Sequence, residues 1–317
     1  MLARSRAKMA SSEISASNGD ASAANAPARD GWVKSDGLTL RYIEWGEPDA
    51  PTIVALHGLR SFAYTWEPVA QSLAGCFRVV ALDQRGRGLS DWDPARRYYT
   101  ESYVRDLEAL VDELELQNFL LLGHSMGGAT AFVYAARHPE RLAGVVIEDI
   151  GPGSSANSSG AERIRRELLG TPDRFGSWFE ATAFWRHQRP NVSEAALQAR
   201  VLHSMKATAS GEVVWRHDAR GIAEARLNAT PAQLVDLWPH VEQVSRPTLV
   251  LRGAHSDFLS AGTAAEMCLR NRRIQCEEIS GAGHYVHDDN LDGFETALHR
   301  FLRSQTLGSW ANGRGDA

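Results

Sequence analysis

The sequence has few cysteines, and they form no pattern that points to a metal site or to disulfides. Cys76, Cys268 and Cys276 are the three cysteines among 317 residues, and neither their odd number nor their spacing matches a metal-ligand or paired arrangement. Small secreted domains that depend on disulfides contain more cysteine. We therefore expect free thiols, a reducing compartment and a cytoplasmic location.

Two further absences narrow the range of partners. No apolar run approaches the roughly 20 residues that a membrane span requires. The net charge is −5, and the lysines and arginines are scattered and form no basic face of the kind that binds nucleic acid. The sequence therefore predicts a small-molecule substrate, no nucleic acid and no membrane as partner, and a monomer or a homodimer.

Large apolar side chains are nearly absent from the first thirty residues, which are rich in Ala and Ser. Such a segment buries too little apolar surface to offset the entropy lost on ordering, so we predict that 1–30 are disordered. Early basic residues also occur in targeting peptides, but no apolar segment follows them, and Glu13 and Asp20 are unusual there. Residues 306–317 are predicted to form a flexible tail.

Alternating strand and helix patterns occupy most of the chain, of which 43% is hydrophobic. The apolar runs cover 38–46, as an edge strand, and then 52–58, 77–83, 118–124, 142–150, 247–253 and 274–284. Runs that are apolar almost throughout are typical of a parallel sheet buried on both faces, and the helical patterns between them imply crossover connections. We predict an α/β fold with a mostly parallel, doubly wound sheet, built from 31–152 and 247–305.

The interval 153–246 interrupts this alternation and is predicted to be a helical cap inserted between two strands of the sheet. Its helical patterns cover 161–169, 174–188, 194–206 and 230–240. The interval is rich in aromatic residues, which either pack the cap against the sheet or line an apolar substrate pocket. For the second role we select Trp178, Phe179 and Trp185.

The segment LLLGHSMGGA (120–129) joins a predicted strand to a helical pattern through a turn that contains Ser125. A serine between glycines, after a strand and before a helix, matches the nucleophile elbow. Small neighbours allow strand and helix to approach closely enough to lift the hydroxyl clear of the backbone. We predict that Ser125 is a nucleophile.

A serine hydroxyl becomes a good nucleophile only when an adjacent base removes its proton. His284, in ISGAGHYVHDD (279–289), follows the last predicted strand, and we favour it over the nearby His287. Acyl transfer also requires N–H donors that stabilise an oxyanion. We expect these donors to be the backbone amides of Met126, directly after the nucleophile, and of Leu59, after the strand 52–58.

Four motifs follow one another along the chain: HGLRS (57–61), DQRGRGLS (83–90), GHSMGG (123–128) and GAGH (281–284). Together they resemble the α/β-hydrolase superfamily over roughly residues 32–305. The resemblance implies the α/β-hydrolase fold, which hosts many activities and therefore does not define one. Serine at position 125 differs from the carboxylate nucleophile of haloalkane dehalogenases and epoxide hydrolases.

Two aspartates compete for the third position of a Ser-His-Asp triad, which orients the imidazole. Asp257 follows the strand 247–253, where the superfamily most often places its acid, although its distance from Gly253 is one residue longer than the usual Gly-x-x-Asp. Asp149 ends the strand 142–150, at the position that haloalkane dehalogenases use. We favour Asp257 by a narrow margin and retain Asp149 as the alternative.

The leading prediction is a carboxylesterase-like hydrolase, without metal or cofactor, that cleaves an ester, thioester or lactone of a small apolar substrate through an acyl-enzyme. One alternative is hydrolysis of a carbon–carbon bond in a vinylogous diketone. This reaction needs a cationic cap residue to bind a carboxylate, with Arg186, Arg216 and Arg220 as candidates. A second alternative is a small-molecule receptor on the same scaffold, with slow turnover.

Overall fold

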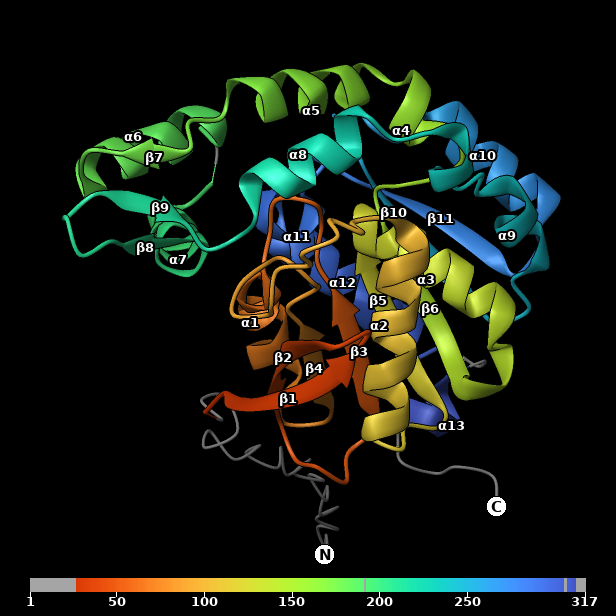
Figure 1. Cartoon of the computed structure of the whole chain (residues 1–317). Coiled ribbons are helices and arrows are strands. Elements are labelled where there is room, and N and C mark those ends of the chain that lie inside the picture. The colour runs from red at the N-terminus through yellow and green to blue at the C-terminus, as the bar shows by residue number, and fades with distance from the viewer. Residues whose placement is uncertain (1–26, 191, 305–306, 312–317) are drawn as a thin grey trace, which may run out of the picture.

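The computed structural model describes residues 27–190, 192–304 and 307–311 (Figure 1). Most of the segment predicted to be disordered, and residues 312–317 of the predicted tail, lie outside the described residues. At both ends the described chain is more regular than expected. Strand β1 begins at Arg29, and helix α13 (Gly308–Ala311) falls within the predicted tail. Trp310 of α13 is buried and stacks on Phe77, with 5.8 Å between the ring centroids.

The centre of the molecule is an eight-stranded sheet with the order β1-β2-β4-β3-β5-β6-β10-β11. Its strands are β1 (Arg29–Ser35), β2 (Leu38–Trp45), β3 (Thr52–Leu56), β4 (Arg78–Leu82), β5 (Phe119–His124), β6 (Leu142–Glu148), β10 (Thr248–Gly253) and β11 (Ile274–Ile279). The β1–β2 and β2–β4 pairs are antiparallel and the others are parallel. The predicted α/β class with a mostly parallel sheet is confirmed, but β1, not the strand at 38–46, lies at the edge.

Helices cover both faces of the sheet, because alternate residues of each strand point to opposite sides. In β3, Val54 and Leu56 join one hydrophobic cluster, while Ile53 and Ala55 join the other. The first cluster is covered by α2 (Thr100–Glu113), α3 (Met126–Arg137), α9 (Trp238–Gln243) and α10 (Ala261–Arg270). The second is covered by α1 (Glu67–Leu73), α11 (Val286–Asp289), α12 (Leu291–Leu302) and α13. This arrangement explains why the strands are apolar almost throughout.

The chain between β6 and β10 lies across the carboxyl end of the sheet, with α5 along the top of the molecule (Figure 1). This insertion contains α4 (Ser154–Asn157), α5 (Ser159–Gly170), β7 (Arg174–Phe175), α6 (Trp178–Gln188), α7 (Glu194–Ser204), β8 (Met205–Ala207), β9 (Val213–Trp215), α8 (Ala219–Leu227) and α9. The carboxyl ends of parallel strands share one edge of the sheet, so the loops that leave β3, β5, β6, β10 and β11 meet beneath it.

The insertion differs from the predicted purely helical cap. A second, three-stranded sheet of order β7-β9-β8 occupies part of it, and 174–175 belong to that sheet instead of to a helix. Helix α8 was not predicted, and the predicted helix at 230–240 is a 3₁₀ turn (Pro231–Gln233) followed by α9. Strands of two or three residues are too short to show an alternating pattern, which explains why the sequence did not reveal this sheet.

Candidate active site

Ser125 lies in a strained turn between β5 and α3. Its φ of 51° and ψ of −113° are rarely adopted by a residue with a side chain. The amide of Ser125 donates to the carbonyl oxygen of Glu148 at the end of β6 (2.9 Å), and the carbonyl of Ser125 accepts from the amide of Ala129 in α3. Strained backbone is concentrated at functional sites, where surrounding contacts maintain it. The turn therefore has the geometry that the nucleophile prediction requires.

The glycines on either side of this turn permit the close contact between α3 and the sheet. A Cβ atom on Gly127 would lie 2.4 Å from the carbonyl oxygen of Leu56 in β3. A Cβ atom on Gly123 would lie 2.4 Å from the carbonyl oxygen of Gly127. Both contacts are with backbone atoms, which cannot move aside as a flexible side chain can. Any larger residue at either position would push the start of α3, and with it Ser125, away from the sheet.

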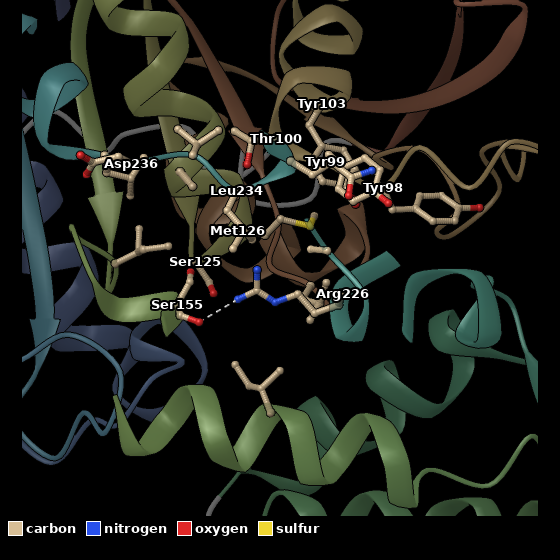
Figure 2. A pocket seen from close by; sticks show the side chains of 18 of the residues that line it. Tyr98, Tyr99, Thr100, Tyr103, Ser125, Met126, Ser155, Arg226, Leu234 and Asp236 are labelled. Carbon is tan, nitrogen blue, oxygen red and sulfur yellow. Dashed lines mark hydrogen bonds between the residues drawn. The ribbon is translucent and has the colours of Figure 1, made fainter. Parts of the chain in front are cut away.

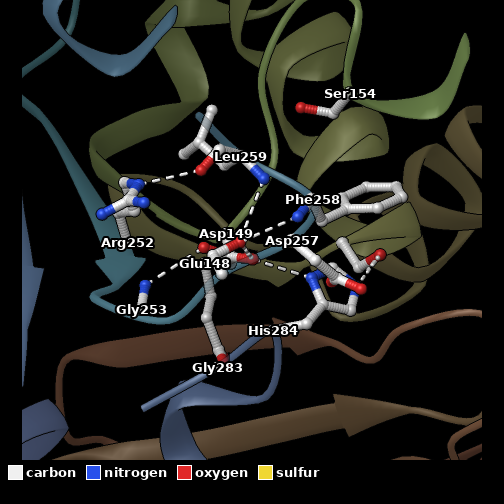
Figure 3. Close-up of polar contacts among 12 residues, drawn as sticks. Glu148, Asp149, Ser154, Arg252, Gly253, Asp257, Phe258, Leu259, Gly283 and His284 are labelled. Carbon is white, nitrogen blue, oxygen red and sulfur yellow. Dashed lines mark hydrogen bonds and ion pairs between the residues drawn. The ribbon is translucent and has the colours of Figure 1, made fainter. Parts of the chain in front are cut away.

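His284 contacts both Ser125 and Asp149. Its Nδ1 lies 2.8 Å from Oδ2 of Asp149 (Figure 3), and its Nε2 lies 3.0 Å from Oγ of Ser125. A carboxylate only accepts hydrogen bonds, so Nδ1 carries the proton and Nε2 is left to accept from the serine hydroxyl. Burial, together with the nearby cation Arg163, lowers the pKa of His284 well below its ordinary value. The imidazole is therefore neutral at neutral pH, as a base must be.

Asp149 is held by hydrogen bonds with residues of β10 and the loop after it. Its φ is 51°, and its amide donates to the carbonyl oxygen of Leu251 in β10. Besides His284, its carboxylate accepts from the amide of Gly253 (3.1 Å) and from the hydroxyl of Ser256 (2.5 Å). Burial raises the pKa of Asp149, and the donors Ser256 and Gly253 oppose this shift. The side chain is fully buried and directed at the imidazole.

Asp257, which the sequence narrowly favoured as the partner of His284, makes a different contact, and this preference is wrong. Its two carboxylate oxygens accept from Nε (2.7 Å) and Nη2 (3.0 Å) of Arg163 in α5. The same bidentate pair lowers the pKa of Asp257 below its ordinary range. Asp257 thus connects the loop after β10 to the insertion. Its side chain binds Arg163 instead of His284, at a position one residue farther from Gly253 than the usual Gly-x-x-Asp spacing.

His287, the competitor of His284, is engaged in a separate buried pair. Its Nδ1 lies 2.8 Å from both carboxylate oxygens of Glu148, and its Nε2 lies 3.0 Å from the hydroxyl of Thr65. Burial alone would lower the pKa of His287, but the Glu148 carboxylate outweighs burial and raises it. The preference for His284 therefore agrees with the geometry.

A cavity of about 420 Å³ opens above Ser125 and is lined by residues of the sheet loops and of the insertion (Figure 2). Leu59 and Met126, the predicted oxyanion donors, both line it. Met126 is the first residue of α3, where backbone amides lack helical partners. The carbonyl of Leu59 accepts from Arg87, which anchors that loop. Both residues therefore line the same cavity as Ser125, and their function as donors stays a prediction.

The aromatic residues chosen for substrate binding do not line this cavity. Trp185 is buried in the interior of the insertion, where it packs edge-on against Trp215 and donates to the hydroxyl of Ser204. Trp178 and Phe179 are 43% and 82% exposed on α6. None of the three lines the cavity, because Trp185 belongs to the hydrophobic core of the insertion and the other two face solvent.

The cationic group at the cavity is one that sequence analysis missed. Arg186 and Arg220 are exposed and pair with Glu194 and Asp173. Arg216 donates from Nε to a backbone carbonyl in β8. Arg226 of α8 instead lines the cavity together with Ser125. No local pattern distinguishes Arg226 from the other arginines, so only the folded chain reveals it.

The described residues contain neither a metal-binding cluster nor a helix suited to a membrane. No group of three or more His, Cys, Asp or Glu residues within 27–190, 192–304 and 307–311 could hold a metal ion. In the same ranges, none of the helices combines the length and the apolar character that crossing a membrane requires.

Comparison with known proteins identifies the family. The model of the alpha/beta hydrolase fold matches residues 51–291, and the chain therefore belongs to the α/β hydrolases. The fold class and the resemblance drawn from the four motifs are confirmed, and the chain is a hydrolase by family.

Three similar proteins illustrate the range of this family. The chain is 32% identical to 3-hydroxybutyrate-oligomer hydrolase of Cupriavidus necator over 77% of this chain and 86% of that protein. It is 30% identical to N-formylmaleamate deformylase of Pseudomonas putida over 86% of this chain and 96% of that protein. An alpha/beta hydrolase structure from Novosphingobium aromaticivorans is 33% identical, with a TM-score of 0.73, over 88% of this chain and 98% of that one.

Proposed function

We propose that this protein is a serine hydrolase that cleaves a carboxylic ester through an acyl-enzyme, with Ser125, His284 and Asp149 as its triad. The observation that supports the proposal is the unbroken chain of contacts from Asp149 through His284 to Ser125, at 2.8 Å and 3.0 Å, at the base of the cavity. The relative from Cupriavidus necator is named for hydrolysis of 3-hydroxybutyrate oligomers, which favours an ester over a thioester or a lactone.

In the acylation step, Oγ of Ser125 attacks the carbonyl carbon of the ester while Nε2 of His284 takes the hydroxyl proton. Asp149 keeps the proton of His284 on Nδ1 and stabilises the imidazolium that forms. The oxyanion is stabilised by the backbone amides of Met126 and Leu59. Collapse of the intermediate breaks the ester C–O bond, and Nε2–H returns its proton to the leaving alkoxide.

The second half of the cycle repeats these roles with water. His284 removes a proton from a water molecule, which attacks the acyl carbon of the Ser125 ester. Collapse of this second intermediate releases the carboxylic acid, and the proton on Nε2 returns to Oγ of Ser125. Burial lowers the pKa of His284, so the imidazole is neutral at the start of both steps, and Asp149 stabilises the imidazolium once the proton has moved.

The test uses a fluorophosphonate probe, which labels only an activated serine, together with hydrolysis of p-nitrophenyl butyrate. Ser125→Ala is expected to abolish both labelling and turnover. Ser72→Ala is the matched control, since the Ser72 hydroxyl donates to a carbonyl of its own helix α1 and lies outside the cavity. Labelling of Ser125→Ala at the wild-type rate would contradict the proposal. Wild-type labelling without turnover of any ester would instead favour the receptor alternative.

A further inference from the structure

We infer that Arg226 binds a free carboxylate of the substrate, so that the natural substrate is a small ester carrying a carboxylate group. The inference rests on the proposed function and adds the substrate class. Figure 2 shows the guanidinium of Arg226 directed into the cavity, toward the side on which Ser125 and Ser155 lie. A cation beside the nucleophile therefore faces the space that the substrate fills.

Arg226, which is partly exposed, differs from the buried arginines in its partners. Arg85 pairs with Asp106 and Arg200 with Asp288, as buried cations usually do. Arg87 donates to two backbone carbonyls and to the Tyr103 hydroxyl. Within the described part of the chain, Arg226 has one hydrogen-bond partner, the carbonyl oxygen of Ser155, at 3.3 Å. Most of its guanidinium donors remain available to a ligand.

Among the described residues, no carboxylate forms an ion pair with Arg226. Burial lowers the pKa of its guanidinium, Tyr103 opposes this, and the cation of Arg165 lowers the pKa further. Among the residues that line the cavity, Asp236 is the acidic one. It is exposed, its carboxylate accepts from the amide of Trp238, and it lies on the other side of Ser125 in Figure 2. A ligand carboxylate would supply the missing partner.

The helix that carries Arg226 is held firmly, which fixes the place from which its side chain enters the cavity. Asp218 caps α8 by accepting from the amide of Gly221 and also accepts from the hydroxyl of Tyr98. Ile222 and Ala225 of α8 form a hydrophobic cluster with Tyr98 and Tyr103. The planar guanidinium at this place matches the two oxygens of a carboxylate, and a lysine ammonium does not.

The experiment compares monomethyl esters of C4 to C6 linear dicarboxylic acids with the same esters in which the free acid is an uncharged amide. Each compound competes with diisopropyl fluorophosphate for Ser125, and its own kcat/KM is measured by methanol release. We expect the wild type to favour the acids by about 10- to 100-fold over the amides, because hydrogen bonds between charged groups exceed neutral ones by this amount.

The variants separate binding from folding. Arg226→Met should remove the preference for the acid while retaining labelling of Ser125, and Arg226→Lys should retain part of it. Arg220→Met, on the same helix but exposed and paired with Asp173, is the matched control and should keep the full preference. Equal competition by acids and amides in the wild type would overturn the inference, as would a preference that survives in Arg226→Met. If Ser125 of the wild type is not labelled at all, the result contradicts the proposed function and not this inference.

Discussion

Two aspartates that end up on the same edge of the sheet have different environments. Asp149, after β6, is fully buried and directs its carboxylate at His284. Asp257, after β10, is partly exposed and directs its carboxylate outward at Arg163 of the insertion. Their pKa values shift in opposite directions, since burial raises that of Asp149 and Arg163 lowers that of Asp257. Position at a strand end is thus insufficient to assign a role, and the decisive factor is which group the side chain meets.

The largest effect is expected from Asp149→Asn. An amide at this position can present a donor to Nδ1, which favours the unproductive tautomer of His284, and acid-to-amide replacement in other triads lowers kcat by about 10⁴-fold. The measurement is kcat for p-nitrophenyl butyrate. Asp257→Asn is the paired control, and a larger loss in that variant than in Asp149→Asn would reverse the assignment.

A smaller effect is expected from Ser256→Ala, which removes a donor from Asp149 and acts through it. Loss of one hydrogen bond to a charged group should reduce kcat by about tenfold. It should also raise the pKa of Asp149, because this donor opposes the effect of burial, and so move the acid limb of the kcat profile to higher pH. Ser256→Thr keeps the hydroxyl and should restore the profile. If the acid limb of the kcat profile does not move in Ser256→Ala, the role of Ser256 is only structural.

For Asp257→Asn itself, we expect kcat to change by less than about threefold and stability to fall by about 0.5 kcal/mol, the size typical of a partly exposed ion pair. Because Arg163 lowers the pKa of Asp257, this contribution is present above the unfolded pKa of about 4 and is lost as pH falls further. Urea unfolding of wild type and variant at pH 7 and pH 3 measures the size of this contribution and its loss at low pH. A difference between wild type and variant that is larger at pH 3 would contradict the direction of the shift.

The smallest effect on kcat/KM is expected from protonation of His284 at low pH. An imidazole of ordinary pKa is only about one-tenth neutral at pH 5.5, which would reduce kcat/KM roughly tenfold from its value at pH 8. Burial lowers the pKa of His284, so the neutral base persists at pH 5.5, and protonation of His284 accounts for less than about a twofold loss. Any further loss belongs to Asp149, because burial raises the pKa of that carboxyl group to about 7. The comparison uses an uncharged ester and a check by circular dichroism that the protein stays folded. The same comparison in Asp149→Asn, which has no carboxyl group to titrate there, isolates the imidazole, and a tenfold loss in that variant with folding intact would show that His284 titrates normally.

The two regions of the molecule also differ in how far sequence led to the answer. In the sheet, apolar runs and the spacing of glycines identified the strand before Ser125, the turn at Ser125 and the loop that carries His284. These features depend on residues that are neighbours in the chain. In the insertion, the same reasoning assigned the aromatic residues to the substrate and overlooked Arg226. Trp185 donates to Ser204 of the predicted helix α7 and packs against Trp215, which belongs to a strand that the sequence did not reveal.

By itself, the amino-acid sequence determined the parallel sheet, the family and the positions of Ser125 and His284, because short-range periodicity and motif order carry that information. Only the tertiary structure decided between Asp149 and Asp257 and placed Arg226 at the cavity. These outcomes depend on contacts over long sequence separations, such as Arg163 with Asp257 and Arg226 with Ser155. A charged side chain acquires its role from the groups that burial brings next to it, and no local pattern records which groups these are.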